Sequence, residues 1–310
     1  MNGDKNAWLG IPLPVLAALW MITGMAALAL NHSLVRLVAA ELDPLQVSAL
    51  RFLWALPIMA LWVLRARGAI LKTRQHRLHF ATGMLTVIMT ATFFIALSRM
   101  PLAEATALNF TAPLFTTIIA ALLLKERVEF ARWGATIIGF IGVLIILRPG
   151  FAEFPLVGLL PVLGAFLLAW WFIGVKHLSA TESTATITVY QTLWAALVLT
   201  VLAASVWVTP TWPTLGYSAA MGVLGTTGMF CTSRAFSMAE ASAVAPLDYL
   251  RLPFIALIAF FAFGEIPDGV SAIGALIITA SAIYIVRRAA VIERQRQQSV
   301  GLDPERAGPT

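Results

Sequence analysis

Residues 96–100 read Ala-Leu-Ser-Arg-Met, and residues 235–238 read Ala-Phe-Ser-Met, about 139 residues later. Residues 134–138, Gly-Ala-Thr-Ile-Ile, return in the same way as residues 274–278, Gly-Ala-Leu-Ile-Ile. Further matches at an offset of about 139 to 147 residues join Pro113 to Pro253, Glu126 to Glu265, Trp54 to Trp194 and residues 13–16 to residues 160–163. The sequence therefore predicts an internal duplication, in which the drifting offset reflects loops of different length.

Each copy is apolar and long enough for five membrane spans of roughly 20 residues each. Because five is an odd number, the second copy enters the membrane in the opposite orientation to the first. Inverted repeats of this kind build alternating access around a mid-membrane site in many secondary transporters. The duplication predicts an all-α integral membrane protein with ten transmembrane helices as two inverted five-helix repeats.

The composition excludes an ordinary soluble domain. Hydrophobic residues make up 60% of the 310 residues, charged residues make up 12%, and the mean hydropathy is +0.87. In soluble domains about a quarter of the residues are charged. The net charge of +6 does not indicate nucleic-acid binding, because the basic residues fall between hydrophobic runs and at the C-terminus. A single cysteine, Cys231, excludes an internal disulfide and a cysteine-based metal site.

Turn-forming residues between the hydrophobic runs delimit ten expected spans. They cover residues 12–31, 44–64, 78–98, 101–124, 130–147, 156–175, 184–206, 213–236, 241–263 and 268–286. With the N-terminus inside, sixteen Lys and Arg residues lie in cytoplasmic segments, and three (Arg36, Arg99 and Arg148) lie outside. The positive-inside rule therefore places both termini in the cytoplasm. We expect a retained first span rather than a signal peptide, a bacterial inner (plasma) membrane location, and a polar tail over 289–310 that need not fold.

Motifs in both halves resemble those of a known family. They are Ala96-Leu97-Ser98, Pro113 and Leu124-Lys125-Glu126-Arg127 in the first half, and Ala235-Phe236-Ser237, Pro253 and Phe263-Gly264-Glu265 in the second. With a Gly-rich helix after each Glu, the chain resembles the EamA-type, ten-span members of the drug/metabolite transporter superfamily. The resemblance covers a first EamA-like repeat, 12–148, and a second, inverted one, 156–288. It implies a metabolite carrier, with export as the expected direction, and leaves the substrate open.

Few ionisable residues lie inside the expected spans, chiefly Arg51, Asp248 and Arg251. A lone charge in hydrocarbon costs at least about 2.5–3.5 kcal/mol, so each must face the bundle interior, a partner or water. Arg251 falls near the bilayer midplane at 1.5 Å per residue, and Asp248, three residues earlier, shares its helical face. The pair either neutralises itself to hold the ninth span, or lines a cavity in which Arg251 binds an anion and Asp248 an ammonium group or a proton. We favour the cavity, which would also include Asn109, the repeat equivalent of Asp248.

Aromatic residues and prolines complete the candidate set. Arg51 has Tyr190 near its repeat position, and contacts either ligand or a neighbouring helix end. Trp54 and Trp194 lie some ten residues into their spans and either wall the cavity, as Tyr249 would, or pack and contact lipid. Pro113 and Pro253 each remove a backbone hydrogen bond in mid-span. They form either passive kinks or a pair of hinges, and the symmetric placement favours hinges.

No catalytic or nucleotide-binding motif is present, which argues against an enzyme and against a self-contained ATP-driven pump. The four histidines, His32, His76, His79 and His177, lie in or beside loops, so we expect no metal site and no cofactor. The leading hypothesis is a secondary carrier of a small polar or amphipathic metabolite, an amino acid or organic anion first. An aromatic vitamin or drug is the alternative substrate, and a channel or intramembrane enzyme is the competing class. Proton or counter-substrate coupling and a homodimer stay open.

Overall fold

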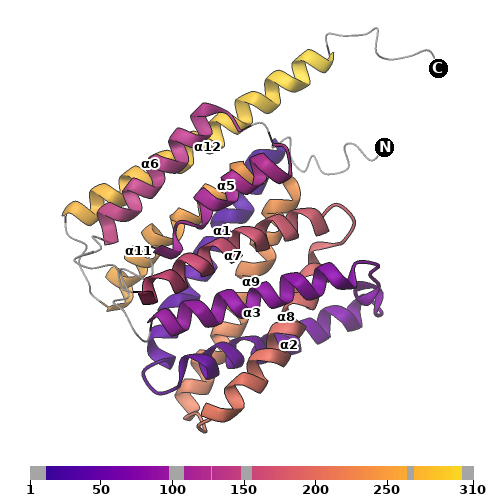
Figure 1. Ribbon diagram of the computed structural model, residues 1–310, viewed down its shortest axis with the longest axis vertical. Coiled ribbons are helices and arrows are strands. Elements are labelled where there is room, and N and C mark those ends of the chain that lie inside the picture. The colour runs from indigo at the N-terminus through magenta and orange to yellow at the C-terminus, as the bar shows by residue number, and fades with distance from the viewer. Residues whose placement is uncertain (1–11, 98–107, 127, 148–155, 264–268, 302–310) are drawn as a thin grey trace.

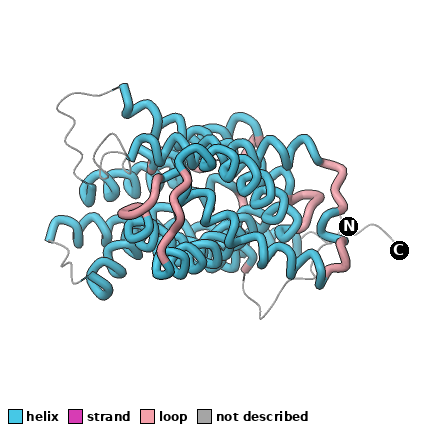
Figure 2. The backbone as a smooth tube through the Cα atoms, turned by 90° about the horizontal axis from the view of Figure 1, so that it is seen from below, coloured by secondary structure: helices cyan, strands magenta, loops and turns pink. Residues whose placement is uncertain are grey.

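The computed structural model describes residues 12–97, 108–126, 128–147, 156–263 and 269–301, and all its regular elements there are helices (Figure 2). Expected features at Arg99, Glu265 and residues 302–310, among others, lie outside these ranges. The α-helices are α1 (Leu13–Val38), α2 (Pro44–Arg65), α3 (His76–Leu97), α5 (Ala112–Leu123), α6 (Phe130–Leu147), α7 (Leu159–Leu178), α8 (Thr184–Ala203), α9 (Trp212–Met238), α10 (Ala241–Val244), α11 (Arg251–Phe263) and α12 (Gly269–Gly301). Short 3-10 helices are η2 (Ala69–Leu71), η3 (Leu156–Gly158), η4 (Ala204–Val206) and η5 (Ala245–Leu250).

Equivalent helices of the two halves make equivalent contacts with the other half. Helix α1 packs on α9 as α3 packs on α7, and α1 packs on α11 as α5 packs on α7. The equivalent pairs α2–α8 and α6–α12 pack on each other, at opposite edges of the bundle (Figure 1). Such reciprocal contacts are those of a pseudo-two-fold arrangement, so the duplication seen in the sequence is also present in the packing.

The protein is a multi-pass membrane protein by the length and polarity of its helices. Within the described part of the chain, six helical segments are long and apolar enough to cross a bilayer: Leu13–Val35, Pro44–Arg65, Leu156–Leu178, Thr184–Val206, Ala241–Ile258 and Gly269–Val291. Two shorter apolar helices cover Ala112–Leu123 and Phe130–Ile146. Large apolar side chains face outward, including Phe261, which is 80% exposed. Lipid, rather than water, suits such a surface.

Two helices extend beyond the expected spans. Helix α1 continues to Val38, about two turns past residue 31. Helix α12 continues to Gly301, so residues 289–301 of the expected polar tail are helical. Backbone hydrogen bonds within a helix do not depend on lipid, which explains how a polar segment can continue an apolar helix.

Both helices that carry the repeated prolines are interrupted just before them. In the second repeat, the six-residue 3-10 helix η5 separates α10 from α11. In the first, α5 begins after a turn at Phe110 and Thr111. Pro113 and Pro253 therefore lie in the first turn of the following helix, where an N–H has no intrahelical acceptor, and do not remove a bond in mid-helix as expected. Pro246, at the start of η5, accompanies the second break and was not predicted.

The connections gather at two ends of the bundle. At one end, the Gln46 side chain bonds both backbone groups of Val208, with Oε1 2.9 Å from the backbone N. At the other, the Thr73 hydroxyl donates to Glu182 at 2.6 Å. We call this second end, formed by the segments between α2 and α3, α5 and α6, α7 and α8, and α9 and α10, the basic end. These are the segments in which the sequence concentrates Lys and Arg.

Close packing of α6 on α12 predicts different effects of the same substitution at two equivalent glycines. A Cβ on Gly274 would lie 2.8 Å from the carbonyl oxygen of Gly142, whereas a Cβ on Gly134 would meet nothing within 4 Å. We expect Gly274→Ala to lower the free energy of unfolding by about 1–3 kcal/mol, as overpacking does. Gly134→Ala, its control, should be neutral or stabilising by up to about 1 kcal/mol. Thermal unfolding in detergent measures both, and equal melting temperatures would contradict the packing.

Candidate functional site

A buried ion pair lies at the break in the second repeat. Asp248 belongs to η5 and Arg251 is the first residue of α11, with Nη2 of Arg251 3.1 Å from Oδ2 of Asp248. Residues three apart in a 3-10 turn lie above one another, which brings the two side chains together. Arg251 is 9% exposed and Asp248 is 3% exposed. The two charges are thus enclosed by protein, as charges in a membrane protein must be.

Asp248 does not accept from all the N–H donors of the Arg251 guanidinium. Its Cζ lies 4.7 Å from the centre of the Phe110 ring, and its Nε has no hydrogen-bond partner among the described residues. Phe110 occupies the turn before α5, so the breaks of both repeats meet at Arg251. A buried donor without an acceptor costs about 1–3 kcal/mol. Arg251 therefore has a donor that a bound ligand can satisfy.

Two further basic side chains lie within electrostatic range of Arg251. Arg51 on α2 interacts with the charge of Arg251, and His32 on α1 interacts with the charges of both arginines. Arg51 packs on Gly225 of α9, where an added Cβ would lie 2.4 Å from Arg51 Nε. We call Arg51, Asp248, Arg251 and His32 the Arg251 cluster; it contains two arginines and one carboxylate, and Asp248 pairs with Arg251. Such a balance favours a ligand with an anionic group.

His32 was missed by the sequence interpretation. Because α1 extends to Val38, His32 lies inside the helix, not in or beside a loop. The preceding Asn31 is fully buried, and its Nδ2 donates to the Met221 carbonyl of α9 at 2.8 Å. That bond satisfies a polar group within an apolar helix, and the helix continues past residue 31, the expected end of the span.

Tyr249 and Asn109 lie on different sides of this region. The Tyr249 ring is buried, with its centre 6.1 Å from that of Phe110, and its hydroxyl has no partner among the described residues. Asn109 is partly buried, and its Nδ2 would lie 3.6 Å from a Cβ on Gly164 of α7. Tyr249 is therefore next to the Arg251 cluster, whereas Asn109 lies beside α7.

The remaining aromatic candidates pack between helices at other places. Trp54 donates from Nε1 to the Ser218 hydroxyl of α9 at 3.0 Å, and the residue is 38% exposed. Tyr190 stacks on His79 of α3 with ring centres 4.5 Å apart, and its hydroxyl donates to the Leu71 carbonyl. Trp194 contacts Phe80 and Gly83, also of α3. The structure thus brings together Arg51, Asp248, Arg251 and Tyr249, and places Tyr190 and Trp194 in the α3–α8 contact.

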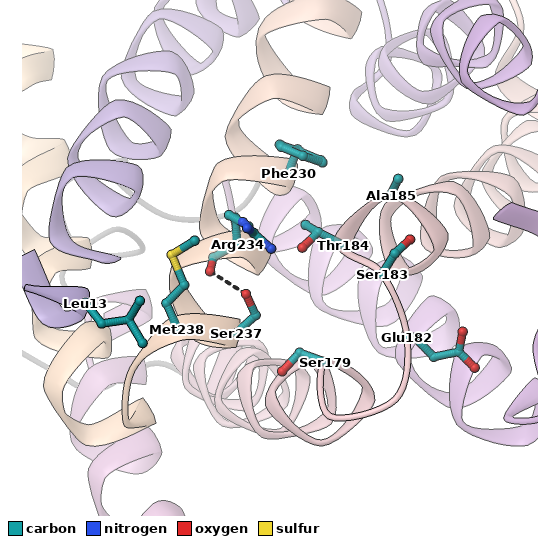
Figure 3. Close-up of a pocket in the computed structure, with 10 residues that line it drawn as sticks. All are labelled: Leu13, Ser179, Glu182, Ser183, Thr184, Ala185, Phe230, Arg234, Ser237 and Met238. Carbon is teal, nitrogen blue, oxygen red and sulfur yellow. Dashed lines mark hydrogen bonds between the residues drawn. The ribbon is translucent and has the colours of Figure 1, made fainter. Parts of the chain in front are cut away.

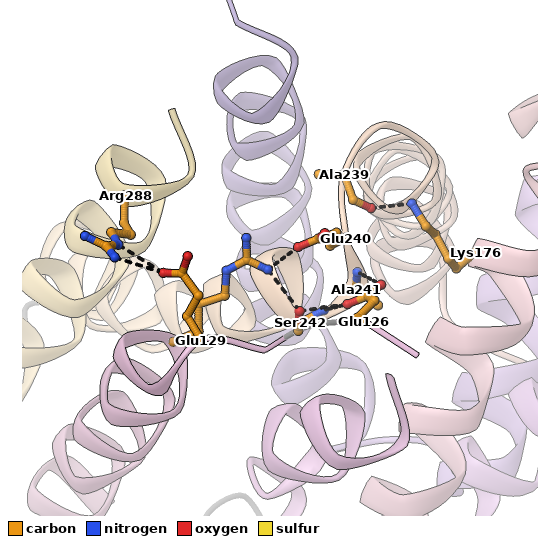
Figure 4. A network of polar contacts seen from close by, with 9 residues as sticks. Glu126, Glu129, Lys176, Ala239, Glu240, Ala241, Ser242 and Arg288 are labelled. Carbon is orange, nitrogen blue, oxygen red and sulfur yellow. Dashed lines mark hydrogen bonds and ion pairs between the residues drawn. The ribbon is translucent and has the colours of Figure 1, made fainter. Parts of the chain in front are cut away.

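A polar network joins the two repeats at the basic end (Figure 4). The Glu126 carboxylate accepts from the backbone N–H groups of Ala241 and Ser242, at 2.8 and 3.0 Å, and from the Ser242 hydroxyl at 2.7 Å. Arg132 pairs with Glu240, and Lys176 donates to the Ala239 carbonyl. Lys125 has a left-handed backbone conformation, with φ of 54°, just after α5, and the N–H of the next residue, Glu126, donates to the Ala120 carbonyl at 3.3 Å. We call Glu126, Arg132, Lys176 and residues 239–242 the latch.

The fit of Arg51 against α9 predicts the effect of one added methyl group. Gly225→Ala must displace the flexible Arg51 side chain rather than backbone. We expect it to weaken substrate binding about tenfold or more while the protein stays folded. Gly216→Ala is the matched control on the same helix, because a Cβ there meets nothing within 4 Å. Equal affinities of the two variants, measured on purified protein, would show that the position of Arg51 does not matter for binding.

Comparison with known proteins identifies the chain's relatives. A model of the EamA-like transporter family matches residues 15–148 and 156–287. An S-adenosylmethionine uptake transporter of Rickettsia bellii is 31% identical over 86% of this chain and 92% of the relative. A riboflavin transporter of Vibrio cholerae is 34% identical over 88% and 94%. A pseudopaline exporter of Pseudomonas aeruginosa is 27% identical over 73% and 80%.

A solved crystal structure shares the fold. It superposes with a TM-score of 0.74 at 19% sequence identity, over 91% of this chain and 98% of that chain. The arrangement of helices described above is therefore found in an experimentally determined protein.

Proposed function

The chain belongs to the EamA-like transporter family of the drug/metabolite transporter superfamily, and we propose that it is a secondary carrier of a small anionic or zwitterionic metabolite. In this proposal the substrate binds at Arg51, Asp248 and Arg251, with Tyr249 and His32 beside them. Transport proceeds by alternating access, with the two repeats moving about this site. An amino acid or an organic anion is the preferred substrate class.

The buried ion pair at the broken helix carries the proposal. Burial of Arg251 and Asp248 is costly in a membrane protein unless the charges are used, and Arg251 keeps an unpaired donor. Interrupted helices meeting at a mid-membrane site are the usual construction of carrier sites. The breaks that precede Pro113 and Pro253 are the proposed hinges.

The proposed topology has ten spans in two inverted repeats, 12–148 and 156–288, in the bacterial inner membrane with both termini in the cytoplasm. The exchange of packing partners between the halves and the clustering of basic loops at one end support it. In this topology the basic end, including the latch, faces the cytoplasm. Thiol labelling of single cysteines introduced at Lys72 and Glu41, after Cys231→Ser, tests it: only the first should be protected in intact cells.

The names of the relatives bear on the substrate. S-adenosylmethionine and riboflavin each combine a flat heteroaromatic ring with polar groups, and the former also carries a carboxylate and an ammonium group. The carboxylate suits Arg251, the ammonium suits Asp248, and a ring can stack near Phe110 and Tyr249. An aromatic vitamin-like compound is therefore the second candidate substrate, favoured by these two aromatic side chains.

Export is the proposed direction. The named relatives include both an uptake transporter and an exporter, and a secondary carrier runs in either direction according to the gradients. Inverted membrane vesicles should accumulate the substrate if export is physiological, and right-side-out vesicles should not. The reverse pattern would establish uptake instead.

Counterflow in liposomes tests the carrier mechanism. Purified protein is reconstituted, loaded with a candidate metabolite, and assayed for accelerated entry of the labelled compound. We expect saturable exchange for an amino acid, an organic anion or an aromatic zwitterion, and none for Arg251→Gln. Uptake that never saturates would indicate a channel, and absence of exchange for every metabolite in the panel would contradict the proposal.

Asp248→Asn tests coupling to protons. If Asp248 carries the proton, transport driven by a pH gradient should fail in this variant while exchange persists.

A further inference from the structure

A pocket with both polar and apolar lining residues lies at the basic end, and none of its lining residues belongs to the Arg251 cluster (Figure 3). Its volume is about 420 Å³. The start of α1, the turn between α7 and α8 and the last turns of α9 enclose it. Leu13 and Phe230 contribute apolar surface, and Ser183, Thr184 and Ser237 contribute hydroxyl groups. The pocket therefore offers polar groups beside an apolar wall.

Arg234 of α9 supplies a free positive charge in this pocket. It is half-buried, and its guanidinium has no hydrogen-bond or ion-pair partner among the described residues. Figure 3 shows the guanidinium extending toward Thr184 at the start of α8. Glu182, also at the pocket, turns away, and its carboxylate accepts from the Thr73 hydroxyl at 2.6 Å. The cation is thus left available for a ligand.

The start of α8 adds donors opposite Arg234. The Ser183 hydroxyl accepts from the backbone N–H of Thr186 at 3.1 Å. The N–H groups of Thr184 and Ala185, in the first turn, have no intrahelical acceptor. They lie at the positive end of a 20-residue helix dipole. A helix start alone would not define a site, but here it faces a cavity that also contains an unpaired arginine.

We propose that this pocket binds a phosphate group, held by Arg234 and by the donors at the start of α8. A guanidinium binds phosphate through two parallel N–H donors. The Ser183 hydroxyl, which accepts from Thr186, can donate a further hydrogen bond to the phosphate. The phosphate belongs either to an anionic phospholipid, whose chains would lie along Leu13 and Phe230, or to a phosphorylated solute. The site does not depend on the proposed transport function, and its test does not use transport.

Binding to purified full-length protein tests the proposal. The probes are dioctanoyl phosphatidylglycerol, detected by native mass spectrometry, and inorganic phosphate, detected by calorimetry. Arg234→Gln should weaken binding at least tenfold. Arg234→Lys should weaken binding severalfold, because the positive charge remains but the two parallel N–H donors of the guanidinium are lost. Arg65→Gln, an exposed arginine at the end of α2 on the same end of the bundle, should bind as the unchanged protein does.

The two probes distinguish the sources of the phosphate. Arg234-dependent binding of the lipid alone identifies a phospholipid site, and Arg234-dependent binding of inorganic phosphate, with or without the lipid, identifies a phosphate site open to solutes. Binding of neither probe overturns the proposal, as does equal weakening by Arg234→Gln and Arg65→Gln. If Arg234→Gln is not monodisperse, Arg234→Lys decides by the same comparison, and unchanged affinity then overturns the proposal.

Discussion

Arg251→Ala is expected to abolish substrate binding and to destabilise the protein by about 3–5 kcal/mol. The destabilisation follows because Asp248, only 3% exposed, keeps a buried charge without its partner. The loss of binding follows because Arg251 contacts both the break of the second repeat, through Asp248, and that of the first, through Phe110. Thermal unfolding and binding by calorimetry measure the two effects separately.

The double change of Asp248→Asn and Arg251→Gln separates scaffold from binding site. It removes both charges together, so no uncompensated charge stays buried, and most of the lost stability should return. If Arg251 binds the substrate, this folded protein should still fail to bind and to transport. A monodisperse double variant with normal affinity would return both residues to a purely structural role.

An exposed ion pair provides the control for these charge changes. Arg288 and Glu129 lie 3.1 Å apart, with side chains 46% and 39% exposed. Pairs of this kind contribute about 0–1 kcal/mol. Arg288→Gln should therefore leave both stability and affinity nearly unchanged, which would show that the effects at Arg251 do not arise from lowering the net charge.

The sequence predicted the repeats and the ion pair because both follow from local rules. The duplication is visible as matching residues, and the spacing of Asp248 and Arg251 puts them on one face in either an α- or a 3-10 helix. The sequence placed the irregularity of this helix at Pro253, whereas the structure has it at η5, before Pro253. A proline restricts its own backbone and the residue before it, but where the helix begins again depends on tertiary packing.

The convergence of side chains from different helices could not be derived from one sequence. Tyr190 and Trp194 occupy repeat positions close to those of Arg51 and Trp54, yet they pack on α3. Their direction is set by the rotation of α8 about its own axis, which sequence spacing does not specify. His32 was missed for a related reason, because the bond from Asn31 to Met221 that permits polar residues inside α1 comes from a helix far away in sequence.

Glu126→Ala is expected to open the basic end and to reduce the maximal transport rate at least fivefold. Glu126 lies in the first repeat and accepts three hydrogen bonds from Ala241 and Ser242 of the second. Hydrogen bonds to a charged group contribute about 1.5–3 kcal/mol each. Losing them disfavours the state in which this end is closed, and a carrier that must pass through that state slows accordingly. The apparent affinity should change less than twofold, because the Arg251 cluster is intact.

Spin labels across the latch measure the opening directly. In a Cys231→Ala background, cysteines replace Phe130, at the start of α6 and 92% exposed, and His177, in the last turn of α7. We expect a longer and broader distance distribution after Glu126→Ala. Glu129→Gln, three residues away and outside the latch, should leave the distribution unchanged, since it removes only the exposed contact with Arg288.

The kinetic pattern decides whether the latch controls access. A gate that does not touch the substrate changes the rate of conformational exchange. Glu126→Ala should therefore lower the maximal transport rate and preserve the affinity. Glu126→Gln, which keeps an acceptor oxygen, should retain part of the maximal transport rate. Arg251→Gln should show the opposite pattern, loss of affinity without a change in the label distances. If Glu126→Ala lowers affinity as strongly as Arg251→Gln and leaves the distances unchanged, Glu126 acts on the binding site and the latch is not a gate.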